Sequence, residues 1–350
     1  VSYYSDQFKC LNKIENINVS EKDNNEPVTV KKSDIAKLLG KVRSSIKNDK
    51  DNSKFFIQHI IPQYYILDNK RVVNPLNMSG TYLEVYVHII LADKAETNNL
   101  IACLNESDLE YKSIVAKPIA SARAVLTEEE MYMGCFMMDI GGGTTDISYV
   151  KGSFFHNNKV ELFGGKNVSF NIAKLLKTSP SNADALKIQY GSAISDIVKS
   201  DEKISVPGIG GRKSTEAPLK FLHEIIESNL SQLFEKIYND SIKTNKNSSK
   251  DYTSGIVVTG GTSQLKNIDI LIYREFNMPV RIGLPILSNI SYPNEDLSKI
   301  PEFSTAIGLL KCARIEEKKI TKNRFKKKTK NINFSMKKIK TFINKTLGGE

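Results

Sequence analysis

At 350 residues the chain is long enough for about two domains, and 40% hydrophobic with 25% charged residues is typical of a globular protein. No run approaches the roughly 18 apolar residues that a membrane-spanning helix requires. The four cysteines and four histidines are scattered without a C-x-x-C pair, so we expect free thiols in a reducing cytoplasm and no zinc site.

The net charge of +11 is concentrated at one end of the chain. Residues 311–350 contain 14 Lys and Arg against 3 Asp and Glu, while the other 310 residues carry 36 of each sign. The body is therefore electrostatically balanced, and the basic end is predicted to act separately, on an anionic partner.

The first 92 residues show mainly strand patterns. Alternating apolar and polar residues predict strands around 14–19, 55–67 and 81–92. A helix is predicted from Lys32 with Ser33 as its N-cap, and Pro62 is predicted to interrupt the second strand.

From residue 94 onward, helical and strand patterns alternate, which predicts a mixed α/β architecture. Predicted helices cover 95–107, 118–130, 183–192 and 219–243. Predicted strands cover 113–116, 135–138, 147–150, 159–162 and 255–259. We find no internal repeat.

The strongest local signal is a triple glycine directly after an apolar strand. Glycines let the backbone turn tightly and bring N–H groups against an anion, while threonine hydroxyls add donors. Two flanking carboxylates suit a hydrated Mg²⁺ that neutralises phosphates, and a plain hairpin turn would not need them. The predicted phosphate-binding residues are Asp139, Gly141, Gly142, Gly143, Thr144, Thr145 and Asp146, with Mg²⁺ held through water by Asp139 and Asp146.

A second buried strand, at 255–259, also leads into a glycine pair. The predicted ligand contacts there are Gly260, Gly261 and Thr262. In open α/β sheets ligands collect beyond the carboxyl ends of strands, so both turns are expected to face one cleft. The absence of G-x-x-x-x-G-K-[ST] and of G-x-G-x-x-G argues against P-loop and Rossmann sites.

These motifs resemble the second phosphate loop and the adenosine loop of the actin-like ATPases. Helical residues 183–193 resemble the segment that contacts adenosine, which would assign Asp184 and Lys187 to ATP. The match is most similar to the FtsA family of bacterial cell-division proteins, and its supporting segments are 59–65, 74–80, 124–130 and 304–310. The resemblance covers about residues 5–314 and recurs in the C-terminal segment.

The resemblance implies an α/β, actin-like (ribonuclease H-like) two-domain fold with the inserted subdomain of FtsA. The implied parts are 1–7 with 93–130 (subdomain 1A), 8–92 (inserted subdomain 1C), 131–189 with 255–315 (subdomain 2A), 190–254 (subdomain 2B), 316–331 (basic linker) and 332–350 (amphipathic helix). FtsA-like chains carry the first strands and a first phosphate loop upstream of the point where Val1 stands, so we expect a fragment or a degraded gene product.

A second departure from the family concerns hydrolysis. Several actin-like ATPases hold a glutamate before a proline to orient water, whereas this chain has Lys117 before Pro118. A protonated lysine is no base, so we expect ATP binding with weak or no turnover and assign no catalytic residue. The alternatives are an ATP-hydrolysing enzyme of the actin and chaperone group, or a shape-determining filament of the MreB type, which 8–92 fits poorly.

The C-terminal segment carries a narrow apolar stripe with lysines on the other side, which is typical of a helix lying in a membrane interface. Burial of these side chains would contribute on the order of 5 kcal/mol. A terminal helix docked on the body and a nucleic-acid-binding tail are the alternatives, and we expect no nucleic acid because aromatic stacking platforms are few. The predicted membrane residues are Ile332, Met336, Ile339, Phe342, Ile343 and Leu347.

By resemblance, the function would be to tether FtsZ filaments to the cytoplasmic face of the bacterial membrane at the septum and to recruit the division machinery. The FtsZ tail would dock around 190–254, where Lys236 and Lys243 are predicted to be available to an acidic peptide. Self-association would use residues 8–92.

Overall fold

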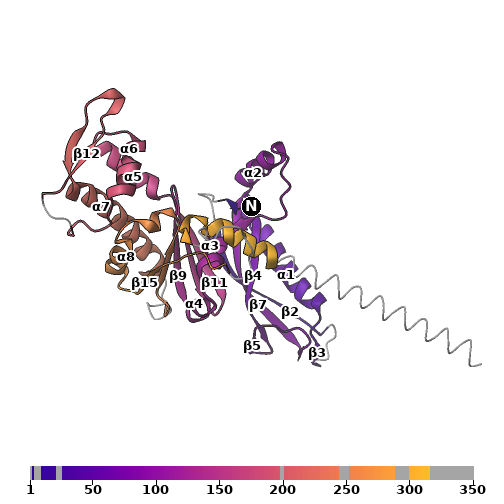
Figure 1. Cartoon of the computed structure of the whole chain (residues 1–350). Coiled ribbons are helices and arrows are strands. Elements are labelled where there is room, and N and C mark those ends of the chain that lie inside the picture. The colour runs from indigo at the N-terminus through magenta and orange to yellow at the C-terminus, as the bar shows by residue number, and fades with distance from the viewer. Residues whose placement is uncertain are drawn as a thin grey trace, which may run out of the picture.

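The computed structural model describes residues 2–3, 9–20, 26–197, 201–243, 252–287 and 299–315. The predicted linker 316–331 and the predicted membrane stripe 332–347 lie outside the described residues. Figure 1 shows three regions: a sheet with one long helix (β2, β7, β4 and α1), a central sheet around β9, and a helical region with α5, α6 and α7.

The first region is a four-stranded antiparallel sheet in the order β2-β7-β4-β5, covered by one helix. Leu38, Val42 and Ile46 of the helix pack against alternate residues of the strands and form a separate apolar core. The elements are β2 (Lys9–Asn18), α1 (Lys32–Lys47), β4 (Phe55–Leu67), β5 (Lys70–Val72) and β7 (Tyr82–Asp93).

Two local predictions in this region are wrong. Helix α1 is capped at Lys31 rather than Ser33, because the Asp34 carboxylate accepts a hydrogen bond from the Lys31 backbone N–H at 2.7 Å. Strand β4 runs through Pro62 without a break, since the pairing with β7 shifts register next to that residue and the missing N–H is not needed there.

Shorter elements lie within this region or next to it. The antiparallel pair β3 (Val28–Thr29) and β6 (Ser79–Gly80) lies beside the sheet, together with the 3₁₀ turn η1 (Lys50–Asn52). Helix α2 (Lys94–Glu106) follows β7 directly, with Asp93 as its N-cap. Strands β1 (Ser2–Tyr3) and β8 (Val115–Ala116) form a parallel pair.

The central sheet has the order β11-β10-β9-β14-β15. Strands β9, β14 and β15 are parallel, whereas β10 and β11 run antiparallel to their neighbours. The strands are β9 (Cys135–Ile140), β10 (Thr145–Lys151), β11 (Phe154–Glu161), β14 (Ile256–Thr259) and β15 (Val280–Ile282).

Helices cover both faces of this sheet, as buried strands require. Phe136 and Met138 of β9 belong to one apolar core with α5 (Gly165–Leu175), α6 (Pro180–Tyr190), α7 (Leu219–Tyr238) and α8 (Ile268–Phe276). Cys135 and Met137 belong to a second core with α3 (Lys117–Val125) and a helix at 304–315. The alternation along β9 assigns Asp139 to the second face, with α3.

The helix predicted over 118–130 is in fact two helices, α3 and α4 (Glu128–Met133). Thr127 separates them because its hydroxyl caps α4 in a capping box with Glu130. The predicted helix 219–243 is α7 continued by the π-helical segment η3 (Asn239–Lys243). Elements that the sequence did not predict include α5, α8, β15, the hairpin β12 (Lys203–Val206) and β13 (Thr215–Pro218), and the 3₁₀ turns η2 (Ile209–Gly211), η5 (Gly261–Gln264) and η7 (Pro301–Phe303).

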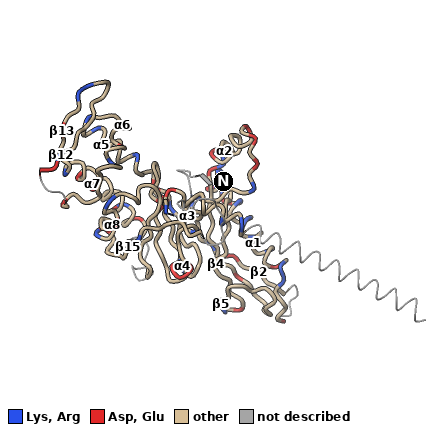
Figure 2. Tube along the Cα trace, in the orientation of Figure 1, with Lys and Arg blue, Asp and Glu red and all other residues tan. Residues whose placement is uncertain are grey.

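Charged residues of both signs lie along all three regions in Figure 2. No helix in the described part of the chain is long and apolar enough to cross a membrane. All four cysteines are free, as predicted.

Candidate functional site

The two glycine turns lie side by side at one edge of the central sheet. Strands β9 and β14 pair in parallel, with Thr259 opposite Asp139, so both strands end at the same level. The Thr262 hydroxyl then donates a hydrogen bond to the Gly141 carbonyl oxygen at 3.0 Å. The two predicted turns are therefore neighbours, and that both face one ligand cleft stays a prediction.

The first turn connects β9 to β10 in a hairpin, with the Gly141 N–H bonded to the Thr144 carbonyl at 2.9 Å. The N-terminus of helix α5 holds this glycine turn in place, because the Gly165 and Lys166 N–H groups donate to the Gly141 and Gly142 carbonyls at 2.9 and 2.7 Å. Gly142 and Gly143 are exposed, and their own N–H groups have no hydrogen-bond partner among the described residues. The turn therefore presents unpaired backbone donors to an incoming anion.

Backbone conformation does not explain the triple glycine. None of Gly141, Gly142 and Gly143 has the positive φ that glycine alone adopts easily, so our tight-turn reason is wrong. A Cβ placed on Gly143 would meet no atom within 4 Å, and one on Gly142 would touch only the Lys166 side chain. Folding therefore does not require a bare backbone at Gly143, and its contact with a ligand stays a prediction.

The two predicted carboxylates are buried beneath this turn. The Asp139 Oδ2 accepts hydrogen bonds from the Ser121 hydroxyl at 2.5 Å and the Thr305 hydroxyl at 3.1 Å. The Asp146 Oδ2 accepts from the Lys117 ammonium at 2.7 Å and the Thr144 hydroxyl at 3.2 Å. Burial raises the pKa of Asp146 to about 6, although the Lys117 charge opposes that shift.

The Thr145 hydroxyl forms a hydrogen bond within the protein. The buried Thr145 hydroxyl donates to the Phe163 carbonyl at 2.8 Å, which ties the start of β10 to the segment before α5. Its hydroxyl hydrogen therefore already has an acceptor, so its contact with phosphate stays a prediction.

The two residues predicted to contact adenosine form an ion pair on α6. The Lys187 Nζ lies 2.7 Å from the Asp184 Oδ1 and also donates to the Ser169 hydroxyl and the Gly165 carbonyl. Burial alone would raise the pKa of Asp184, but hydrogen bonds from Lys187 and Ser169 outweigh it and lower that pKa. The bond to Gly165 links this pair to the strand-end turns.

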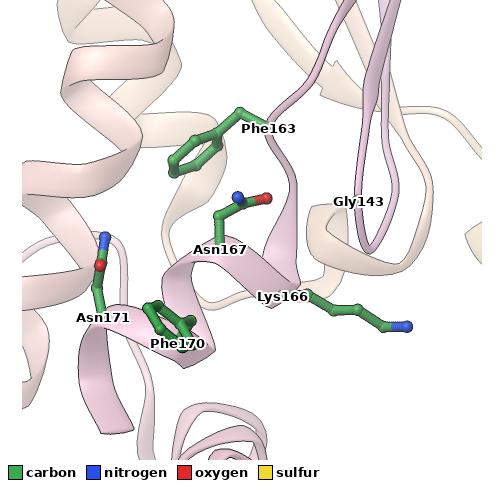
Figure 3. Close-up of a pocket in the computed structure, with 6 residues that line it drawn as sticks. All are labelled: Gly143, Phe163, Lys166, Asn167, Phe170 and Asn171. Carbon is green, nitrogen blue, oxygen red and sulfur yellow. The ribbon is translucent and has the colours of Figure 1, made fainter. Parts of the chain in front are cut away.

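A cavity of about 370 Å³ opens next to the tip of the first turn. In Figure 3 the Lys166 side chain extends beneath the turn that carries Gly143, while Phe163 and Asn167 lie on the opposite side of the segment 163–166. The residues that line the cavity are Gly143, Phe163, Lys166, Asn167, Phe170 and Asn171. The cavity offers one cation, amide groups and two aromatic rings next to the unpaired N–H groups.

Sequence reasoning missed several residues that build this site. Gly164 and Gly165 allow the close approach of α5, since a Cβ on Gly164 would lie 2.6 Å from the Gly141 oxygen and one on Gly165 would lie 2.5 Å from the Thr262 hydroxyl. The glycine pair at a strand-to-helix junction was a readable signal. Nothing in the sequence pointed to Ser121 or Thr305, because their roles depend on tertiary packing.

The Lys236 ammonium forms a 2.6 Å ion pair with Glu161, while its side chain is 61% exposed. Its contact with an acidic peptide therefore stays a prediction. The side chain of Lys243 lies outside what the structure describes. Arg212 and Lys213, near the tip of the β12–β13 hairpin, are exposed cations in the same part of the chain.

The described residues do not show the predicted Mg²⁺ site. Among the described residues, no group of three or more His, Cys, Asp or Glu side chains is arranged to hold a metal ion. Only one of the four Asp139 and Asp146 carboxylate oxygens, the Asp146 Oδ1, is buried without any hydrogen-bond partner.

Comparison with known families gives two matches along the chain. Residues 136–308 match the family model "Cell division protein FtsA", and residues 6–91 match "SHS2 domain inserted in FTSA". The chain is 31% identical to the cell division protein FtsA of Escherichia coli K12 over 309 residues, which cover 87% of this chain and 70% of that protein. It is 36% identical to FtsA of Neisseria meningitidis over 256 residues, covering 72% of this chain and 60% of that protein.

Solved structures agree on the fold. MreB5 of Spiroplasma citri bound to AMPPNP has a TM-score of 0.52 at 20% identity, covering 66% of this chain and 67% of that chain. The PilM-PilN type IV pilus biogenesis complex has a TM-score of 0.56 at 16% identity, covering 86% of this chain and 75% of that chain. These likenesses establish the actin-like fold and no more. With the sequence relatives, they make this chain a cell-division protein that belongs to the FtsA family.

Proposed function

We propose that the chain is an ATP-binding adaptor that holds FtsZ filaments at the cytoplasmic face of the cell membrane during septum formation. The observation that carries the nucleotide part is the exposed turn at Gly142 and Gly143, whose N–H groups lack a partner among the described residues. Asp184, Lys187 and Thr262, which the family resemblance assigns to adenosine, lie near this turn: Lys187 donates to the Gly165 carbonyl and Thr262 to the Gly141 carbonyl. A protein with the same fold, MreB5, was solved with AMPPNP, which supports this ligand class.

The sharpest test of the nucleotide site is Gly143→Val. The added side chain meets open space in the protein, so the free energy of unfolding should change by less than about 0.5 kcal/mol. It would project where a phosphate must approach the amides, so the affinity for a fluorescent ATP analogue should fall by at least about tenfold.

The matched control is Gly40→Val on α1, where a Cβ also meets nothing within 4 Å. This variant should bind the analogue with unchanged affinity. If Gly143→Val binds as tightly as the unmodified chain, the glycine turn is not the nucleotide site.

Weak or absent hydrolysis follows from the state of Lys117. Its ammonium donates to the buried Asp146 carboxylate at 2.7 Å, and an ion-paired lysine cannot take a proton from water. Phosphate release well above about one turnover per minute would instead favour the enzyme alternative.

The membrane part of the proposal rests on the apolar stripe of residues 332–347 and on family membership. Deleting residues 332–350 should release the chain from vesicles that contain anionic lipid, measured by flotation, while ATP binding is kept. Undiminished flotation of the shortened chain would contradict membrane binding through this segment.

The FtsZ part concerns residues 190–254, where Arg212 and Lys213 are the exposed cations near the hairpin tip. The double substitution Arg212→Glu and Lys213→Glu should weaken binding of an FtsZ tail peptide without unfolding the chain, because neither side chain is buried.

Self-association through 8–92 belongs to the same proposal, and light scattering of the full chain with and without ATP would measure it.

A further inference from the structure

Lys117 lies beside the two buried carboxylates in a position that the fold fixes. It is the first residue of α3, and the Pro118 that follows is buried and fixes the local backbone. The Pro118 carbonyl accepts a hydrogen bond from the buried Ser148 hydroxyl of β10 at 3.0 Å. The Lys117 side chain itself is only 19% exposed, so its position is set by the fold and not by solvent.

The ammonium lies between both carboxylates and the glycine turn. Its Nζ is 2.7 Å from the Asp146 Oδ2 and 3.9 Å from the Asp139 Oδ2. A Cβ on Gly141 would be 3.5 Å from the same nitrogen, so the charge also reaches the turn that presents the free amides.

This arrangement does not fit a hydrated Mg²⁺ at the same two carboxylates. The Asp139 Oδ2 already accepts hydrogen bonds from Ser121 and Thr305, and the Asp146 Oδ2 already accepts from Thr144 and Lys117. The Asp146 Oδ1 has no hydrogen-bond partner among the described residues, but it is buried away from solvent, where a hydrated ion does not reach it. A divalent cation would also have to lie close to the fixed positive charge of Lys117, which repels it at short range.

We propose that Lys117 takes the place of the divalent cation, so that the chain binds the phosphates of its nucleotide without metal. This inference rests on the proposed function, because it concerns the same glycine turn. The ammonium neutralises part of the buried negative charge of Asp139 and Asp146, and it lies beside Gly141, the first residue of the turn that carries the free amides.

The test compares the affinity of the full chain for a fluorescent ATP analogue with Mg²⁺ in excess and with EDTA in its place. The unmodified chain should show dissociation constants that differ by less than about threefold between the two buffers. In Lys117→Gln, EDTA should weaken binding by about tenfold or more relative to Mg²⁺, because the fixed cation is gone. Lys117→Arg keeps the charge and should bind equally in both buffers.

Two further variants keep the test decisive. If Lys117→Gln fails to fold because it leaves two buried carboxylates uncompensated, Lys117→Gln with Asp146→Asn removes one of them and should show the same dependence on Mg²⁺. Lys166→Gln removes the other lysine beside the turn, which has no ion pair among the described residues, and should change affinity equally in both buffers.

The possible failures are distinguishable. Tight binding of the unmodified chain with Mg²⁺ and weak binding with EDTA would overturn the inference and leave the nucleotide site intact. An equal dependence on Mg²⁺ in Lys117→Gln and Lys166→Gln would overturn it as well. No binding in either buffer would overturn the proposed nucleotide site and this inference together.

Discussion

The two glycine turns look alike in the sequence, yet they use glycine for different reasons. At Gly260 the backbone has φ +88°, and a Cβ would lie 2.4 Å from the Asp139 Oδ1 and 2.6 Å from the Ile140 oxygen. At Gly143 the backbone needs no glycine, and the space around a Cβ is open. Gly260 is therefore required by the fold, whereas Gly143 is free for a ligand.

The largest expected effect separates the two turns by stability. Gly260→Ala forces a side chain into an unfavourable φ and against the buried Asp139 carboxylate, so it should lower the free energy of unfolding by about 3 kcal/mol or more. Urea unfolding measures this loss. The matched change Gly143→Ala in the first turn meets no atom within 4 Å and should cost less than about 0.5 kcal/mol. Equal losses in the two variants would remove the distinction between structural and ligand-facing glycines.

The position of both turns was predictable, but this distinction was not. An apolar strand followed by glycines locates a strand end, and the parallel pairing of β9 with β14 confirms that both turns meet. Gly260 has a positive φ where the second turn packs against Asp139, and the sequence does not reveal this tertiary contact. Ser121 and Thr305 were missed for the same reason, since they reach Asp139 from α3 and from the helix at 304–315.

Most long elements of the fold were predicted from periodicity, and the misses have local causes. Helix α8 begins after Asn267 in a left-handed conformation without a side-chain cap, so no N-cap signal marks its start. Helix α5 begins with Gly165 after Gly164, which resembles a loop in sequence. The break between α3 and α4 was readable in the Thr127 and Glu130 capping box and was overlooked.

The second-largest expected effect is a loss of stability in acid, which comes mainly from two histidines outside both turns. Burial, with the nearby Arg123 charge, lowers the pKa of His59 to about 4, and burial, with His156 and His59, lowers the pKa of His88 to about 4. Both stay neutral in the folded chain while the unfolded chain gains protons below its pKa of 6.5, so stability is complete above that value and is lost as pH falls toward 4. Each histidine contributes a loss of about 2 kcal/mol between pH 7 and 5.

Asp146, whose pKa burial raises to about 6, acts in the opposite direction. It binds a proton more readily in the folded chain than in the unfolded chain, so its protonation offsets part of the loss of stability. The net change between pH 7 and 5 should therefore be a destabilisation of about 2 kcal/mol, measured by urea unfolding at both values. His88→Gln should show a smaller loss than the unmodified chain, and Gly143→Val should show the same loss. A chain that is equally stable at both pH values would contradict the assignment to the histidines.

The smallest effect tests how strongly the two turns are coupled. Thr262→Val removes the hydroxyl that donates to the Gly141 carbonyl at 3.0 Å, but that oxygen also accepts the Gly165 N–H at 2.9 Å and so keeps a partner. The cost should be about 0.5 kcal/mol, at the low end for a hydrogen bond, and Thr262→Ser should restore it. A loss above about 2 kcal/mol would mean that the second turn holds the first in place, and the ligand-facing turn would then not be independent of the structural one.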